Sequence, residues 1–106
     1  MTNKIIVLST AANEEEAEKI ARRLVEEKLA ACVNVVPGVQ SFYRWEGKIE
    51  RSGEWLLVIK SSRENFERIR TALEKLHSYD VPEVVALPIV DGSKNYLNWM
   101  EAELSA

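Results

Sequence analysis

The apolar residues of this chain switch repeatedly between strand spacing and helix spacing, and the order of the switches limits the fold. Residues 4–10 are a short β-branched run, which is typical of a buried strand. In residues 14–29 the apolar side chains recur at three- and four-residue steps, which predicts a helix with one buried face. Asn13 and Glu16 form a capping box that would start this helix.

Residues 31–62 return to strand spacing and predict a long hairpin. Apolar residues alternate as far as Trp45 and again from Ile49, so two strands are expected with Glu46-Gly47 as the turn between them. Pro37-Gly38 interrupts the first strand. Because proline donates no hydrogen bond to a sheet, we expect a bulge or bend there.

The second half of the chain repeats the order of helix and strand. Ser61 and Glu64 form a second capping box before an amphipathic helix over residues 63–77. Pro82 disfavours helical geometry in the residue before it, so a connection is expected up to that point. A strand is predicted over residues 84–87, and Ser93 can cap a last helix.

Together these elements run β-α-β-β-α-β and end in a C-terminal helix, which is the split βαβ, or ferredoxin-like, order. Right-handed crossovers would place both main helices on one face of a four-stranded antiparallel sheet. We therefore predict an α+β sandwich with a long hairpin between its second and third strands. A length of 106 residues fits a single domain over residues 1–106.

The charge and the cysteine count exclude several classes of protein. The chain has 14 Lys and Arg against 17 Asp and Glu, a net charge of −3, which disfavours a sequence-independent nucleic-acid binder. One Cys and one His allow neither an internal disulfide nor a structural zinc site within one chain. No apolar run is long enough for a membrane span or a signal segment, so we expect a cytoplasmic protein.

An enzymatic function has little support in the residue types present. The glycines are dispersed, so there is no glycine-rich phosphate loop. A nucleophilic pair of Cys32 and His77 would need contact between distant parts of the chain. Ser9-Thr10 before the first helix suggests an acylphosphatase-like anion site, but Ala11-Ala12-Asn13 supplies no arginine for that chemistry. We expect a protein that is not an enzyme.

Cys32 and His77 are the side chains best suited to a soft or borderline metal. Cys32 lies among small apolar residues and is expected to be a buried hydrophobe, although an accessible thiol could bind Cu(I). His77 follows the second predicted helix. There it is either a hydrogen-bonded structural residue or a ligand for copper or zinc.

The hairpin carries Tyr43, Trp45 and Trp55 on strands that extend beyond what a core of this size can cover. These aromatic side chains either pack beneath the chain's own helices or lie on neighbouring subunits. Because association removes exposed aromatic surface and unpaired strand edges, we expect an oligomer.

A collinear set of short motifs runs through essentially the whole chain. The motifs are Leu29-Ala30-Ala31-Cys32-Val33-Asn34, Pro37-Gly38, Ser41-Phe42-Tyr43-Arg44-Trp45-Glu46-Gly47-Lys48-Ile49, Ile59-Lys60, His77-Ser78-Tyr79, Pro82-Glu83, Pro88-Ile89 and Tyr96-Leu97-Asn98-Trp99. In this order and at these spacings they closely resemble the CutA family, the divalent-cation tolerance proteins. The resemblance implies a ferredoxin-like subunit in a compact homotrimer, and a cytoplasmic role in tolerance to divalent metals, chiefly copper.

The resemblance also suggests metal ligands. The copper site proposed for enterobacterial relatives resembles a Cys after the first strand and a pair of His residues, which match Ser9, Leu76 and His77 here. Since two of those three ligands are absent, we expect no obligatory cofactor and only weak binding of Cu²⁺ or another divalent cation. His77 would be the first ligand, helped by Glu83, Cys32 or a neighbouring subunit.

Two further groups of residues fall in the family motifs. Tyr43, Trp45, Lys60 and Tyr79, together with Glu83, either form structural contacts or line a cleft between subunits that binds a small molecule. At the trimer interface we expect the three tryptophans, Trp45, Trp55 and Trp99.

The main hypothesis is therefore a trimeric, non-enzymatic protein of the CutA type with a role in the response to metal ions. The alternative is a small-molecule sensing or regulatory module that binds in the cleft between subunits, since trimeric PII-type signalling proteins look similar in architecture. A third interpretation is a stable scaffold whose motif residues only hold the trimer together.

Overall fold

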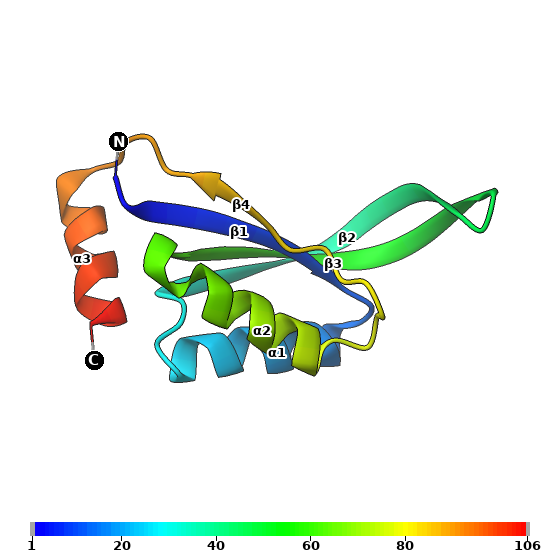
Figure 1. The fold of residues 1–106 in the computed structure, drawn as a ribbon, viewed down its shortest axis with the longest axis horizontal. Coiled ribbons are helices and arrows are strands. Elements are labelled where there is room, and N and C mark those ends of the chain that lie inside the picture. Colours follow the sequence, from blue (N-terminus) through cyan, green and yellow to red (C-terminus); the bar gives the residue numbers. More distant parts are fainter. Residues whose placement is uncertain (1, 106) are drawn as a thin grey trace.

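The fold is a four-stranded antiparallel sheet with two helices against one face and a third helix at one end (Figure 1). The computed structural model describes residues 2–105. The strands are β1 (Lys4–Ala11), β2 (Cys32–Trp45), β3 (Lys48–Ser62) and β4 (Val85–Pro88). The helices are α1 (Glu14–Glu26), α2 (Phe66–Leu76) and α3 (Lys94–Leu104), and the 3-10 helix η1 (Arg63–Asn65) precedes α2.

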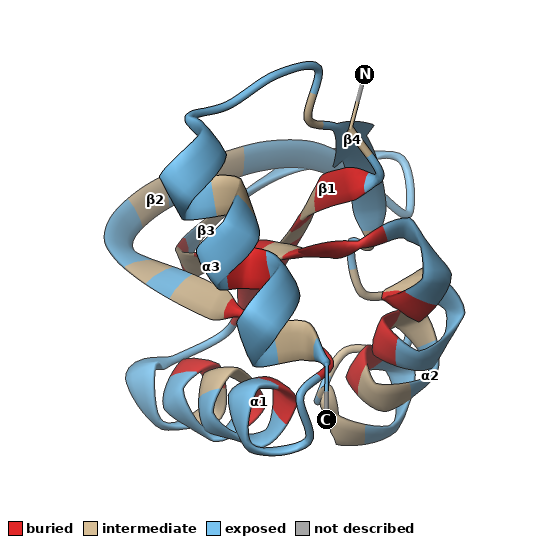
Figure 2. Ribbon diagram, turned by 90° about the vertical axis from the view of Figure 1, so that its left-hand side faces the viewer, coloured by how far each residue is buried: buried red, intermediate tan, exposed pale blue. Residues whose placement is uncertain are grey.

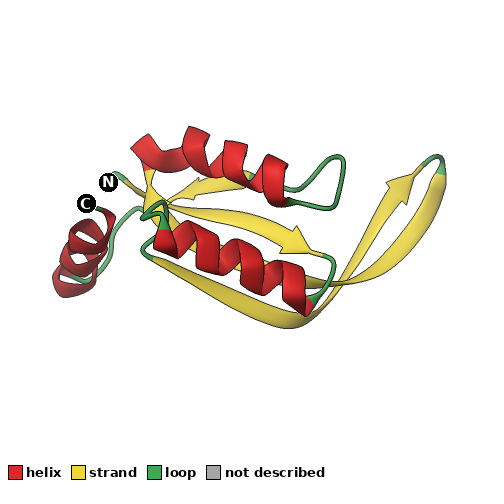
Figure 3. Cartoon of the chain, turned by 90° about the horizontal axis from the view of Figure 1, so that it is seen from below, coloured by secondary structure: helices red, strands yellow, loops and turns green. Residues whose placement is uncertain are grey.

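The strand order in the sheet is β2-β3-β1-β4, and neighbouring strands are antiparallel. Helix α1 connects β1 to β2 across β3, and α2 connects β3 to β4 across β1, so each forms a split βαβ unit. Both helices lie against the same face of the sheet (Figure 3). The predicted ferredoxin-like α+β fold is confirmed.

The core lies between the sheet and α1 and α2, where the buried residues of the helices face the strands (Figure 2). Alternate residues of β1 and β3 enter it, together with one stripe from each helix. Its fully buried large side chains include Val7, Leu57, Ile59, Ile20, Leu24, Ile69 and Leu73. Burying one such side chain contributes about 1.5–3 kcal/mol, so this layer is the main source of stability.

Helix α1 begins as predicted, because the side chain of Asn13 accepts a hydrogen bond from the Glu16 N–H at 2.8 Å. The predicted end at residue 29 is wrong, because the helix stops at Glu26. Lys28 has a left-handed backbone with φ of 57°. Its N–H donates to Val25, and the N–H of Leu29 donates to Leu24. These two bonds are a Schellman motif, with lysine in the position that glycine usually occupies.

The capping box predicted from Ser61 and Glu64 does not form. Ser61 is a buried residue of β3 whose hydroxyl donates to the carbonyl of Leu29. The 3-10 helix η1 follows the strand, so α2 begins only at Phe66. Ser93 does precede α3, but its carbonyl, not its side chain, accepts the first hydrogen bond.

The hairpin has the predicted bulge and turn. The register of β2 against β3 shifts between Val36 and Val39, at Pro37-Gly38, where Gly38 has a positive φ of 76°. At the tip, Glu46 and Gly47 have φ of 49° and 79°, as in a type I′ turn. The hairpin then extends well beyond the helices, and the subunit measures 45 × 25 × 23 Å (Figure 1).

The sheet face opposite α1 and α2 is apolar and mostly uncovered. Paired residues in antiparallel strands point to the same face, so Leu87 of β4 stands beside Ile6 of β1, and Val85 stands beside Leu8. Val85 and Leu87 remain 46% and 49% exposed. We call this surface the open face.

Helix α3 covers only one end of the open face. Met100 is buried there, and the Lys4 ammonium donates to the Glu101 carboxylate at 2.5 Å. This bond, together with the one from Ser105, lowers the pKa of Glu101. Among residues 2–105, no helix is both long enough and apolar enough to cross a membrane.

Candidate functional site

His77 is held at the centre of a hydrogen-bonded cluster at the end of α2. Its side chain is completely inaccessible to solvent. Nε2 lies 2.5 Å from the carbonyl oxygen of Thr10, and Nδ1 accepts from the N–H of Tyr79 at 3.1 Å. A carbonyl only accepts and an N–H only donates, so the ring is the neutral tautomer that carries its proton on Nε2. Both nitrogens are therefore occupied.

Glu16 of α1 is the charged member of this cluster. Its carboxylate accepts from the Ser78 N–H at 3.0 Å and from the Ala12 N–H at 3.1 Å, and it lies 3.8 Å from Nδ1 of His77. Burial alone would raise the pKa of Glu16, but the hydrogen bonds from Ser78 and Ala12 leave that pKa below its ordinary value. The carboxylate thus fastens the loop after α2 to the start of α1.

Tyr79 joins the same loop to the base of the hairpin. Its ring packs on His77 with centroids 4.5 Å apart, and its hydroxyl donates to Glu54 of β3 at 2.8 Å. Burial, followed by the hydrogen bond and charge of Glu54, raises the pKa of Tyr79. The hydroxyl of Tyr43 bonds that of Ser52 at 2.7 Å, two residues from Glu54 along β3.

The three predicted metal ligands do not meet within one chain. Cys32 is the first residue of β2 and is paired with Lys60 of β3. Thr10, whose carbonyl bonds His77, lies on β1, two strands away from β2 and four residues further along the strands. This corresponds to roughly 16 Å. Glu83 is exposed. Within residues 2–105, no three Cys, His, Asp or Glu side chains are arranged to hold a metal.

The same separation leaves no Cys32–His77 dyad within one subunit. At the other positions that match the relatives' copper site, Ser9 is buried in the core and Leu76 packs against it. The Ser9 hydroxyl has no hydrogen-bond partner among the described residues. Neither side chain supplies a metal ligand.

The predicted cleft residues form two separate groups. Tyr79 bonds Glu54, and Tyr43 bonds Ser52 two residues away on β3. Lys60 is six residues from Glu54 along β3, roughly 20 Å away, and donates to Asn34. Trp45 lies at the opposite end, beside the hairpin tip, and is 54% exposed. A cleft that used all of these residues would have to draw them from different subunits.

The predicted interface tryptophans also differ in their surroundings. Trp55 packs against the core of its own subunit. Trp99 is 43% exposed on α3 and stacks with Tyr96 at 5.5 Å. Trp45 is exposed on the hairpin, as are its neighbours Phe42 and Ile49.

The sequence did not reveal Thr10, Glu16 and Glu54 as members of the cluster. Glu16 gave a capping signal, and its N–H does bond the Asn13 side chain, but its carboxylate bonds the N–H of Ala12 instead of that of Asn13. Its second role, at Ser78, depends on contact across 62 positions of the chain. No local pattern reports such a contact.

Comparison with known proteins gives a consistent result. The family model described as CutA1 divalent ion tolerance protein matches residues 5–103. Divalent-cation tolerance protein CutA of Thermus thermophilus is 48% identical over 95 residues, covering 90% of this chain and 92% of the relative. The corresponding protein of Yersinia pestis is 43% identical over 103 residues, covering 97% of this chain and 87% of the relative.

Solved structures agree with the sequence matches. CutA from Xylella fastidiosa superposes with a TM-score of 0.96 at 39% identity, covering 98% of this chain and all of that chain. A protein from Archaeoglobus fulgidus, described as a periplasmic divalent cation tolerance protein CutA, gives 0.94 at 42% identity, covering 96% and 99%. An Arabidopsis thaliana relative is named as chloroplastic. The compartment of this chain therefore stays a prediction.

Proposed function

The chain belongs to the CutA1 divalent ion tolerance family, and from that premise we propose that it acts as a homotrimer in tolerance to divalent cations. It performs this role in the cytoplasm and without catalysis. The family membership supports the cation-related role. Exposed apolar surfaces of the subunit support the trimer.

The main support for the proposed trimer is the open face of the sheet. Ile6, Leu8, Val85 and Leu87 share this face, and Val85 and Leu87 are 46% and 49% exposed. Exposed apolar surface is removed from water when copies of the chain pack these faces together, which contributes about 25 cal/mol per Å² buried. The closed assembly also protects the edge strands β2 and β4.

The hairpin adds exposed apolar side chains beyond the helices of its own subunit. Phe42 and Ile49 stand on one face of the hairpin and are 68% and 63% exposed, with the Arg51 guanidinium 5.8 Å from the centre of the Phe42 ring. Trp45 stands on the other face and is 54% exposed. A hairpin that reaches past its own helices can bury these side chains only on a neighbour. These exposed side chains support an assembly in which each hairpin lies along the next subunit.

Light scattering coupled to size exclusion tests the assembly. We expect three times the 12.1 kDa subunit mass at micromolar concentration. Val85→Glu should give smaller species, because it places a charge on the open face. Val25→Glu is the matched control, since Val25 is 44% exposed on α1, on the helical side of the subunit. A monomeric wild type, or equal masses for both variants, contradicts the proposal.

Direct copper binding, in this proposal, is weak and secondary. A single subunit does not hold the predicted set of His77, Glu83 and Cys32 together, so the site fits a tightly bound metal poorly. His77 could bind Cu²⁺ only after Nδ1 releases the Tyr79 N–H, or Nε2 releases the carbonyl of Thr10. The lost hydrogen bond lowers the net affinity by about 0.5–1.5 kcal/mol.

Calorimetric titration of Cu²⁺ into wild type and His77→Ala tests this metal proposal. We expect weak binding that decreases in the variant. Circular dichroism should confirm that His77→Ala is folded before the comparison is made. Equal affinities of the two proteins would remove His77 from the site, and affinity in the nanomolar range would contradict a weak site.

Small-molecule sensing is the second candidate function, and the group formed by Tyr43, Glu54 and Tyr79 favours it. These residues combine aromatic walls with one buried carboxylate, which suits a small ligand at a subunit boundary. A thermal-shift screen distinguishes the two functions, because a ligand specific to the folded protein raises its melting temperature. Stabilisation by an organic ligand that Tyr79→Phe abolishes would favour sensing.

A further inference from the structure

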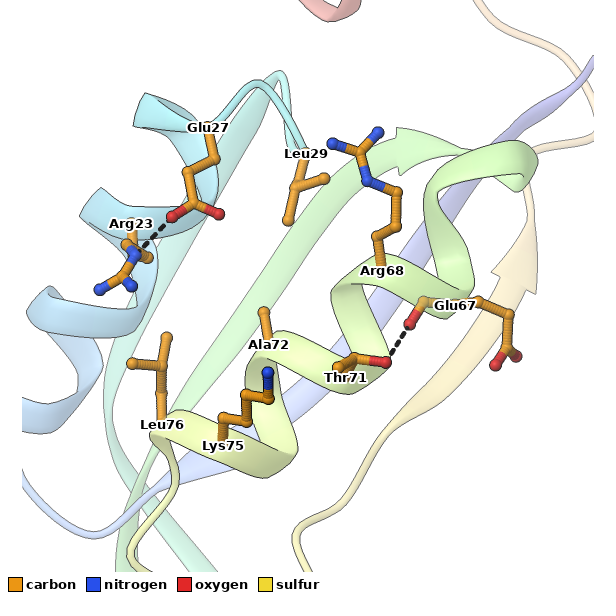
Figure 4. Close-up of a pocket in the computed structure, with 9 residues that line it drawn as sticks. All are labelled: Arg23, Glu27, Leu29, Glu67, Arg68, Thr71, Ala72, Lys75 and Leu76. Carbon is orange, nitrogen blue, oxygen red and sulfur yellow. Dashed lines mark hydrogen bonds and ion pairs between the residues drawn. The ribbon is translucent and has the colours of Figure 1, made fainter.

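The two helices enclose a groove that none of the preceding roles uses. It lies between α1 and α2, on the side of the subunit away from the open face, and has a volume of about 420 Å³ (Figure 4). This volume falls within the range of small-molecule sites. Its floor is apolar and consists of Leu29, Ala72 and Leu76.

The rim of the groove is predominantly cationic. Arg23 borders it from α1, and Arg68 and Lys75 border it from α2 (Figure 4). Glu27 is the one carboxylate that remains on this side, and it is paired with Arg23 at 2.5 Å. Glu67 projects away from α1 and is held by Arg70 at 2.8 Å. The whole chain has a net charge of −3, so the positive charge at this rim is a feature of the groove and not of the protein as a whole.

Arg68 and Lys75 are available to a ligand. Among the described residues, no carboxylate forms an ion pair with either side chain, and neither donates a hydrogen bond to the protein. They are seven positions apart on α2, two turns or about 10 Å along the axis. The short side chains of Thr71 and Ala72 leave the space between them open.

The floor is held in place before any ligand arrives. The N–H of Leu29 closes the Schellman motif at the end of α1, and its carbonyl accepts from the hydroxyl of Ser61 and the amide of Asn65. Ser61 and Asn65 are themselves buried. Because these residues are already ordered, a ligand that binds the groove loses less free energy to the ordering of the protein.

We propose that the α1–α2 groove is a binding site for a small organic anion, with its apolar body on Leu29, Ala72 and Leu76 and its carboxylate or phosphate between Arg68 and Lys75. An apolar floor selects a carbon framework, and unpaired cations at its edge select a negative group. The site is complete within one subunit. It is therefore independent of the trimer, of His77 and of the proposed role in cation tolerance.

Amide chemical shifts in ¹H–¹⁵N spectra test the site with 3-phenylpropionate as the probe. We expect saturable shifts at Leu29 and along 68–76, with a dissociation constant on the order of 1 mM. The neutral analogue 3-phenylpropanamide should bind at least about fivefold more weakly, because it lacks the charge. Equal binding of the two compounds, or shifts confined to other surfaces, overturns the proposal.

Matched variants separate the groove from general electrostatics. Arg68→Gln combined with Lys75→Gln should weaken binding of 3-phenylpropionate at least about fivefold. Arg22→Gln combined with Lys94→Gln makes the same charge change at two exposed positions that do not line the groove, and should leave the affinity unchanged. Equal effects of the two pairs would show a non-specific response to net charge and would contradict a built site.

Discussion

The imidazole of His77 donates a hydrogen bond from Nε2 to the carbonyl oxygen of Thr10, 67 positions away in the sequence. The contact joins the loop after α2 to the end of β1, and it leaves Nδ1 to accept from the N–H of Tyr79. The only histidine of the chain therefore stabilises a chain connection. In this conformation it offers no lone pair to a metal.

Replacing His77 should destabilise the fold. In His77→Ala the carbonyl of Thr10 and the N–H of Tyr79 lose their partner, which costs about 1–3 kcal/mol for each group left buried. We expect a lower melting temperature, measured at equal protein concentration because the assembly contributes to stability. Asp80→Ala changes an exposed neighbour whose side chain forms no hydrogen bond or ion pair among the described residues, and should have little effect. Equal melting temperatures for His77→Ala and wild type would contradict the structural role.

Acid should weaken the fold partly through Glu16. The pKa of this carboxyl lies below its ordinary 4.5 in the folded chain, so the unfolded state binds more protons there. The ionised Glu16 carboxylate therefore contributes its full stabilisation at pH values above 4.5, and this stabilisation is lost as the pH falls through the lower pKa of the folded state. We expect Glu16→Gln to lower the free energy of unfolding at pH 7 and to flatten its fall between about pH 5 and pH 3. Parallel curves for the two proteins would argue against this.

Glycine at position 28 should stabilise the subunit. Lys28 has φ of 57° at the C-terminus of α1, and the left-handed region costs a non-glycine residue about 1–2 kcal/mol. After the larger backbone entropy of glycine in the unfolded state is subtracted, Lys28→Gly should gain about 0.5–1 kcal/mol. Lys28→Ala is the control, since alanine keeps the strain. A gain in both variants, measured by chemical denaturation, would assign the effect to charge and not to backbone geometry.

Two of the buried serines, Ser9 and Ser61, should respond differently to alanine. Both are fully buried, but only Ser61 has a partner, the carbonyl of Leu29. Ser61→Ala should lose about 1 kcal/mol, whereas Ser9→Ala should be neutral or stabilising by up to about 1 kcal/mol, because it removes a buried hydroxyl without a hydrogen bond. Urea denaturation of both variants gives the comparison. A loss at Ser9 as large as that at Ser61 would show that its hydroxyl is satisfied.

The order and type of the elements could be predicted from the sequence because each depends on neighbours along the chain. The capping of α1 by Asn13, the bulge at Pro37-Gly38 and the turn at Glu46-Gly47 are local events, and the structure contains all three. The switch between the two periodicities also identified the faces that enter the core. Recognition of the CutA motifs extended these local signals to the family.

The candidate site could be predicted only in part, because its residues meet through packing. Tyr79 was expected in a functional cluster, but its partner Glu54 belongs to the middle of β3. Ser61 had the sequence pattern of a helix cap, yet the packing of Leu29 against the same strand made it a buried donor. Lys60 and Cys32, expected beside the cluster, lie far along the sheet.

Local spacing by itself thus determined the secondary structure, the topology and the family of this protein. The tertiary structure alone decided which polar groups satisfy one another, and which apolar and cationic surfaces remain open. The physical reason is that secondary structure follows from interactions a few residues apart. The hydrogen bonds of His77, Glu16 and Tyr79 join segments 25 to 67 positions apart and exist only once the helices have packed on the sheet.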